Sequence, residues 1–186
     1  NGGNLDMDAI ASVTSLKLTN PTGAVDVSNL ATTDTVEIIR GGATQDSSLT
    51  YLATGVTGTA DAATVTLNGI TAGADLAFVG AVETMTFNVT GDVSLADFDL
   101  AAGTTAVTVN ATGGDLTVTN QLTNAGVLTY TVTGSGDVDT NAITLGAAVT
   151  TYDASTATGD QDLIAPATVI TITTGTGADD VDMAAT

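Results

Sequence analysis

The chain has 186 residues, of which 21 are Asp or Glu and two are Lys or Arg, giving a formal net charge of −19. It contains no His, Cys or Trp, so it lacks a thiol nucleophile, an imidazole base and the usual ligands of zinc, haem and iron–sulfur clusters. Lys17 and Arg40 are its only cationic side chains, which excludes a nucleic-acid interface because phosphate recognition needs clustered Lys and Arg. We therefore expect a structural or cation-binding protein rather than an enzyme.

The composition favours β-strands. The sequence is rich in Thr and Val, which are β-branched residues that prefer strands, whereas the usual exposed helix formers are nearly missing. The hydrophobic share of 43% is sufficient for a packed core, and with only 3% aromatic residues that core must be aliphatic. No run approaches the ~20 apolar residues of a membrane span, so we expect no membrane insertion.

Short segments of alternating polar and apolar residues recur along the chain, and each predicts a strand with one buried face. In chain order they are residues 16–19, 36–39, 65–69, 85–91, 107–113, 128–134 and 169–175. The three clearest copies begin at Met85, Val107 and Leu128, at a nearly constant interval. We expect these three segments to pair in register in a parallel sheet.

This alignment makes two further predictions about side chains. Phe87, Val109 and Tyr130 occupy the same place in the three segments, so we expect them to stack on one face of the sheet. A Gly-Asp pair and an apolar residue follow the later strands, and the apolar residues Leu116 and Val138 should be buried. In these pairs we expect Gly to supply the positive φ of a corner and Asp to satisfy local backbone donors.

A period of this size with short strands predicts a parallel β-solenoid of ~20–22-residue coils. The alternative is one or two antiparallel β-sandwiches, whose strands also recur at short intervals. We expect residues 1–186 to form a single repetitive domain, cut from a longer surface protein. The interval between residues 41 and 63 is longer than the others, which predicts an insertion or a distorted turn there.

The C-terminal residues 174–182 resemble the nonapeptide of repeats-in-toxin (RTX) proteins, with Thr174 in place of the first Gly. In that family Gly carbonyls and an Asp carboxylate of adjacent coils bind Ca²⁺. The resemblance implies Gly175, Gly177 and Asp179 as ligands, and we add Asp182. The stretch two nonapeptides upstream, 157–162, is a poor copy, so a calcium site and a solvated turn both stay open here. The other Gly-Asp corners we interpret as ordinary solvated turns.

The composition of the whole chain, together with the RTX-like end, resembles bacterial surface-layer (S-layer) proteins of the type I-secreted, calcium-dependent kind. This resemblance implies a secreted structural protein that self-assembles into a lattice on the bacterial cell surface, with Ca²⁺ as cofactor. Its partners would be further copies of itself and other envelope components such as lipopolysaccharide. The alternative is an adhesin or biofilm-matrix stalk made of repeat coils.

Two other patterns bear on function. The first is a set of Thr-x-Thr pairs: Thr64/Thr66, Thr84/Thr86, Thr117/Thr119, Thr129/Thr131/Thr133 and Thr171/Thr173. Rows of such pairs would suit an ice-binding face, but these pairs fall in different phrases of the repeat, so we expect them not to form one rank. We interpret them as ordinary exposed strand residues. Asp97 and Asp99 have the spacing of a carboxylate pair, but surrounding aromatics and cations are scarce. We expect a solvated loop there and no catalytic residue.

Overall fold

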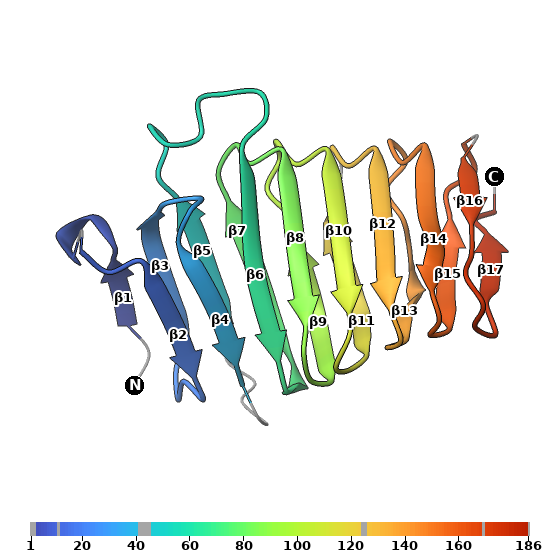
Figure 1. Ribbon diagram of the computed structural model, residues 1–186, viewed down its shortest axis with the longest axis horizontal. Helices are drawn as coiled ribbons and strands as arrows, with labels where there is room; N and C mark the ends of the chain where they lie inside the picture. Colours follow the sequence, from blue (N-terminus) through green and yellow to red (C-terminus); the bar gives the residue numbers. More distant parts are fainter. Residues whose placement is uncertain (1–2, 11, 41–45, 124–125, 169, 186) are drawn as a thin grey trace.

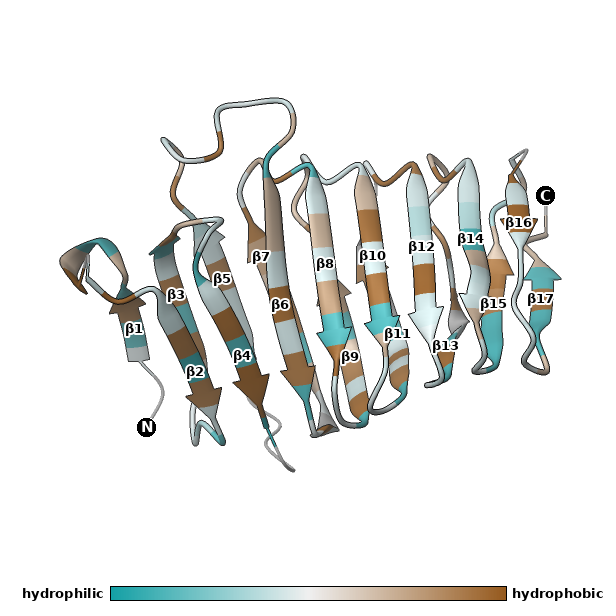
Figure 2. Cartoon of the chain, viewed as in Figure 1, coloured by the Kyte–Doolittle hydropathy of each residue, from teal (hydrophilic) through white to brown (hydrophobic). Residues whose placement is uncertain are grey.

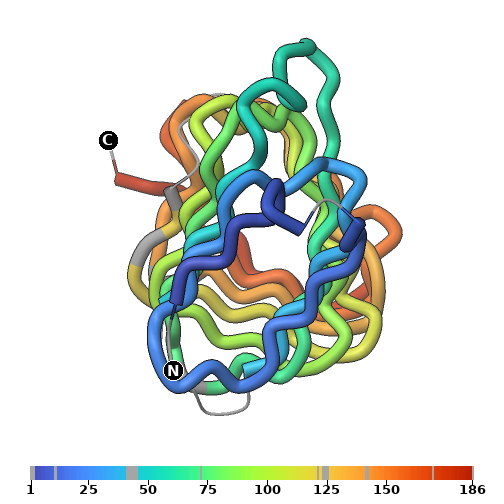
Figure 3. Tube along the Cα trace, turned by 90° about the vertical axis from the view of Figure 1, so that its left-hand side faces the viewer, coloured from blue at the N-terminus to red at the C-terminus, as the bar shows by residue number. Residues whose placement is uncertain are grey.

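The computed structural model describes residues 3–10, 12–40, 46–123, 126–168 and 170–185. It is an all-β parallel solenoid of about eight stacked coils, seen from the side in Figure 1 and along the stack in Figure 3. Each coil contributes one strand to each of two sheets, and every strand pairing is parallel. The predicted fold class is therefore confirmed, and the antiparallel alternative is wrong.

The eight-stranded sheet lies toward the viewer in Figure 1. Its strands are β2 (Ser15–Thr19), β4 (Thr35–Ile39), β6 (Ala62–Asn68), β8 (Thr84–Val89), β10 (Ala106–Ala111), β12 (Thr129–Gly134), β14 (Thr151–Ala157) and β16 (Thr171–Thr173). Its pairings run without a register shift from β2 to β12, and the first shift falls between β12 and β14.

The nine-stranded sheet forms the opposite side. Its strands are β1 (Gly3–Asp6), β3 (Val25–Leu30), β5 (Ser47–Tyr51), β7 (Ile70–Val79), β9 (Val93–Asp99), β11 (Leu116–Thr123), β13 (Val138–Thr144), β15 (Gln161–Ala165) and β17 (Asp180–Met183). A short 3-10 turn, Asp8–Ile10, follows β1. Bulges or other register shifts interrupt this sheet at four of its pairings, so the first sheet is the more regular of the two.

The core fills the space between the two sheets. Strands such as β8 alternate buried and part-exposed residues, which is the pattern of one face packed and one face solvated, and Figure 2 shows the resulting bands of hydropathy. Leu116 and Val138 are buried as predicted, at 3% and 6% exposed, and the structure pairs them with each other. A cavity of about 30 Å³ remains beside Leu116, lined also by Val109, Val132 and other apolar side chains.

The register confirms the in-register stacking of β8, β10 and β12 and corrects one detail. Val109 pairs with Phe87 and with Val132, whereas Tyr130 pairs with Val107. The predicted row of Phe87, Val109 and Tyr130 is therefore wrong at its last member, which lies two positions away. The Tyr130 side chain still points into the core. The cause is the interval between β10 and β12, which is 23 residues and therefore longer than the phrase alignment assumed.

Two other expectations need correction. The Thr-x-Thr pairs do not all form one rank, since Thr117 and Thr119 lie in the nine-stranded sheet, but within the eight-stranded sheet Thr64, Thr86, Thr108 and Thr131 pair in succession across four strands. Asp97 and Asp99 belong to strand β9 rather than to a loop.

The long interval of the repeat is visible in the register. Val36 pairs with Val65, and Val65 pairs with Phe87, so the chain between β4 and β6 is longer than the chain between β6 and β8. Residues 41–45 lie outside the described part of the chain. Within the rest of the interval, β5 is a regular strand, and residues 52–61 form a loop that projects from the stack (Figure 1).

Candidate functional site: an aspartate ladder at the coil corners

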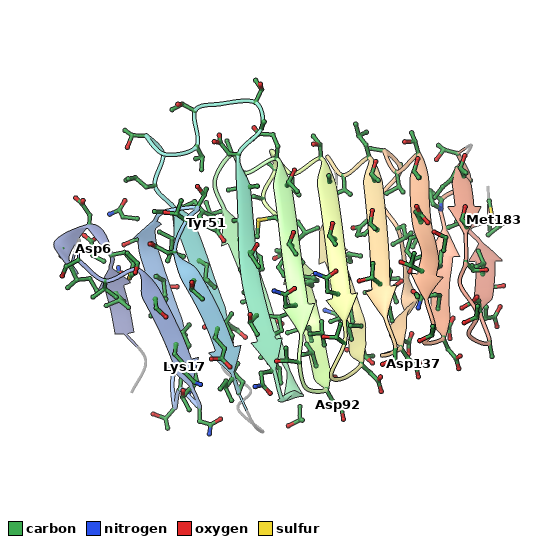
Figure 4. All side chains as sticks on the ribbon, in the orientation of Figure 1. Asp6, Lys17, Tyr51, Asp92, Asp137 and Met183 are labelled. Carbon is green, nitrogen blue, oxygen red and sulfur yellow. The ribbon has the colours of Figure 1, made fainter. Side chains whose placement is uncertain are left out.

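A line of aspartates runs along one edge of the solenoid, at the corners that join β8 to β9 and the equivalent strands of the following coils. We call Asp92, Asp115, Asp137 and Asp160 the corner ladder; Figure 4 labels Asp92 and Asp137 on this edge. The Asp115 amide donates to Asp92 Oδ1 at 3.3 Å, the Asp137 amide to Asp115 Oδ1 at 2.9 Å, and the Asp160 amide to Asp137 Oδ1 at 2.7 Å. Each carboxylate thus accepts a hydrogen bond from the next coil, not from its own turn.

The glycine that precedes each of these aspartates allows the coils to approach. A Cβ built on Gly114 would lie 2.2 Å from the Gly91 carbonyl carbon, and one on Gly136 would lie 2.1 Å from the Gly114 carbonyl oxygen. The next corner, at Gly159, is equally tight, at 2.2 Å from the Gly136 carbonyl oxygen. Only a residue without a Cβ fits such contacts, so the Gly-Asp phrase encodes close coil stacking and the hydrogen bond between coils together.

The acidic residues are distributed unequally over the molecule. Of the 21 Asp and Glu residues, nine lie in strands of the nine-stranded sheet and two, Glu37 and Asp153, in strands of the eight-stranded sheet; the other ten lie in connections and in the 3-10 turn. All four carboxylates of the corner ladder are exposed. Neither Lys17 nor Arg40 forms an ion pair with these carboxylates. Lys17 pairs with Glu37 at 3.0 Å, and the buried Arg40 donates a hydrogen bond to Ser47.

A second, shorter ladder crosses the nine-stranded sheet. The Asp75 amide donates to Asp46 Oδ1 and the Asp97 amide to Asp75 Oδ1, both at 3.2 Å, and Asn120 donates to Asp97 Oδ1 at 2.6 Å. Burial raises the pKa of Asp75, and the negative charges of Asp46, Asp97 and Asp99 raise that pKa further. Asp97 therefore belongs to a ladder between coils.

Three of the four predicted calcium ligands belong to one connection between strands. Gly175, Gly177 and Asp179 lie in the connection between β16 and β17, whereas Asp182 is exposed in β17 and alternates with the inward Val181. Asp179 Oδ1 accepts the Gln161 amide at 3.0 Å. This turn stacks on the upstream stretch at an interval of 18 residues, as the RTX resemblance implies.

The stretch below this turn is organised around a glutamine. Gln161 is 0% exposed, accepts the Tyr152 hydroxyl at 2.8 Å, and donates through Nε2 to the carbonyls of Gly159 and Asp160. Two carbonyls of this lower turn are thus already hydrogen-bonded to a side-chain amide. The upper turn, with Gly175, Gly177 and Asp179, is the better candidate for holding a cation.

The described residues contain no group of three or more Asp or Glu side chains arranged to hold a metal ion. The corner ladder itself was not predicted from the sequence, where its members were interpreted as ordinary solvated turns. The signal was present in the repetition of Gly-Asp at intervals of 22 and 23 residues, because a continuous ladder needs an Asp at the same corner of successive coils.

Comparison with known proteins gives no match to a protein-family model, to a curated protein or to a solved structure. The part of the chain that the structure describes contains no helix with the length and hydropathy of a membrane span.

Proposed function

We propose that this protein is a structural, calcium-associated component of a bacterial surface layer, secreted to the cell surface, where its copies self-assemble into a lattice. The observation that carries the proposal is the corner ladder, a row of exposed carboxylates repeated at the ~4.8 Å spacing of stacked strands. Such a row repels itself and a second copy alike, and a divalent cation bound to its free oxygens would remove both effects.

Calcium is the cation that the donor set favours. It takes six to eight oxygen ligands from carboxylates and backbone carbonyls, and the C-terminal turn offers both kinds at Gly175, Gly177 and Asp179. Asp182 lies on the outer face of β17 and remains a predicted ligand with a separate test. Calcium at this turn would join the last coils and neutralise part of the net charge of −19.

The second candidate function is an adhesin or biofilm-matrix stalk. The parallel stack favours it as much as a lattice, because a solenoid of repeated coils is also a suitable spacer. The two functions differ in their response to calcium: a lattice requires the ion, whereas a stalk stays monomeric with or without it.

Calorimetric titration with Ca²⁺ tests the site. We expect wild-type protein to bind weakly, in the ~10⁻⁴–10⁻³ M range of extracellular modules, and Asp179→Asn to bind less. Asp182→Asn tests the added ligand, and Asp26→Asn, an exposed aspartate of β3, is the matched control. Equal heats from wild type and Asp179→Asn would remove Asp179 from the ligand set.

Electron microscopy of the same protein tests the assembly. We expect ordered arrays in millimolar Ca²⁺ that dissolve when a chelator is added. A monomer under both conditions would contradict the lattice and favour the stalk.

A further inference from the structure

The outer face of the eight-stranded sheet carries two adjacent ranks of threonine. The first rank contains Thr84 between Ala62 and Ala106, followed on consecutive strands by Thr129, Thr151 and Thr171. The second rank runs from β6 to β16 and contains Thr64, Thr86, Thr108, Thr131 and Thr173. Asp153 on β14 is the one residue in this rank that is not a threonine. We call these nine threonines the threonine face.

The array is regular in two directions. Neighbours within a rank are one strand spacing apart, ~4.8 Å, and the two ranks are two positions apart along each strand, ~6.6 Å. No register shift falls within this part of the sheet between β6 and β12, and β8, β10 and β12 run side by side in Figure 1. Because the β-branched Thr side chain is stiff at χ1, its hydroxyl and methyl groups repeat with the backbone.

The hydroxyls of this face are available to an external partner. In the described part of the chain, none of the nine forms a side-chain hydrogen bond within the protein. The neighbouring rank differs, because Asn110 donates to Asn88 and Thr133 donates to Asn110, both at 2.8 Å. The two threonine ranks therefore present unpaired groups, each able to donate one hydrogen bond and accept two.

The face is also free of charge in its central part. Strands β6, β8, β10 and β12 contain no Asp, Glu, Lys or Arg, although the chain carries a net charge of −19. Charged groups would impose their own hydration shells, whereas alternating methyl and hydroxyl groups leave the first water layer to be ordered by the spacing of the array.

We propose that the threonine face binds ice. A partner that repeats in two directions on the scale of a few ångströms matches the array, and crystalline water is such a partner. Each methyl restricts the orientation of first-shell water, and each hydroxyl hydrogen-bonds into that layer. Unlike the lattice role, this activity does not depend on calcium or on the corner ladder.

Two other occupants fit the face less well. A crystalline polysaccharide is recognised by exposed aromatic rings, but all six aromatic residues of the chain are buried in the core. A second copy of the chain would remove nine unpaired hydroxyls from water, and each hydroxyl left without a partner would cost free energy. Ice supplies water to every hydroxyl, so each hydroxyl of the face keeps a hydrogen-bond partner without any protein group.

Thermal hysteresis and inhibition of ice recrystallisation, measured on the whole chain without calcium, test the proposal. Thr108→Tyr places a bulky ring in the middle of the second rank and should lower activity about tenfold or more, the loss that about 1.4 kcal/mol of binding free energy produces. The matched control is Thr117→Tyr, because Thr117 is an outward, part-exposed residue of β11 on the opposite sheet. Equal melting temperatures for both variants would verify that each is folded.

We expect wild type and Thr117→Tyr to shape ice crystals and Thr108→Tyr to lose this activity. A wild-type protein without ice activity, or variants that lose it equally, would overturn the proposal. Sedimentation that shows association sensitive to Thr108→Tyr, without ice activity, would assign the face to contact between copies instead. The ice-activity results leave the calcium-dependent lattice untouched, since its tests use other residues.

Discussion

Replacing Gly114 by Ala should force two coils of the solenoid apart at the corner ladder. The new Cβ would lie 2.2 Å from the Gly91 carbonyl carbon and 2.4 Å from the Asp92 amide nitrogen. Both are backbone atoms, so no side-chain rotation relieves the overlap. The coils would have to separate by about 0.8 Å at this corner to bring the nearer contact to 3.0 Å.

The cost of this separation has two parts. Overpacking of a well-packed site costs about 1–3 kcal/mol. Separation also stretches the bond from the Asp115 amide to Asp92 Oδ1, which is already 3.3 Å long, and a hydrogen bond to a charged group contributes about 1.5–3 kcal/mol when intact. Because this bond is long and exposed, we expect a total loss of about 3 kcal/mol, which lowers the melting temperature by about 6–12 °C in a chain of this size.

Urea unfolding followed by circular dichroism measures the effect. Gly3→Ala is the control, because its Cβ would meet no atom within 4 Å, and we expect its free energy of unfolding to stay within about 0.5 kcal/mol of wild type. A Gly114→Ala protein that unfolds at the wild-type urea concentration would refute the close stacking of the corners.

Three further predictions concern the core and the second ladder. Leu116→Ala, at a site 3% exposed, should lower the free energy of unfolding by about 2–5 kcal/mol, and a loss below about 0.5 kcal/mol would mean that the side chain faces solvent. Val132→Ile adds one methylene beside the cavity of about 30 Å³ and should stabilise the protein by about 0.5–1.5 kcal/mol in the same urea assay, whereas destabilisation would show that the cavity is closed to it. Because burial and then the charge of Asp46 raise the pKa of Asp75, the folded state binds that proton more tightly than the unfolded chain, and stability should rise as the pH falls from neutral toward 3.8. Asp75→Asn should therefore melt higher than wild type at neutral pH and depend less on pH; an unchanged pH profile would contradict this.

The fold could be predicted because the sequence shows both of its periods, the two-residue alternation within a strand and the longer interval between coils. The alternation of residues such as Met85, Phe87 and Val89 fixes which face of a strand is buried, and the interval between copies fixes a parallel stack. Alternation does not determine which residues of neighbouring strands pair, because a shift of two positions keeps every side chain on the same face. Tyr130 was placed two positions from its true row for this reason.

The candidate site depended on contacts between coils, and these were harder to predict. The Gly-Asp corners at Gly114 and Gly136 could be recognised in the sequence, but the hydrogen bonds that join their aspartates to the next coil could not. The threonine ranks were missed because the Thr-x-Thr pairs were assigned to different phrases of the repeat, whereas Thr64, Thr86, Thr108 and Thr131 pair in succession across four strands. Alternation alone could not distinguish an Asp that bonds to its own turn from one that bonds to the next coil.

The melting temperature in calcium tests the central functional claim most directly. Wild-type protein should be compared in about 10 mM CaCl₂ and in NaCl of equal ionic strength, so that screening is matched. With a dissociation constant of ~10⁻⁴–10⁻³ M, binding to the folded state alone contributes about 1.4–2.7 kcal/mol and raises the melting temperature by about 3–10 °C. Asp179→Asn should show a smaller rise. A wild-type melting temperature that is the same in both salts would contradict a calcium-associated structure.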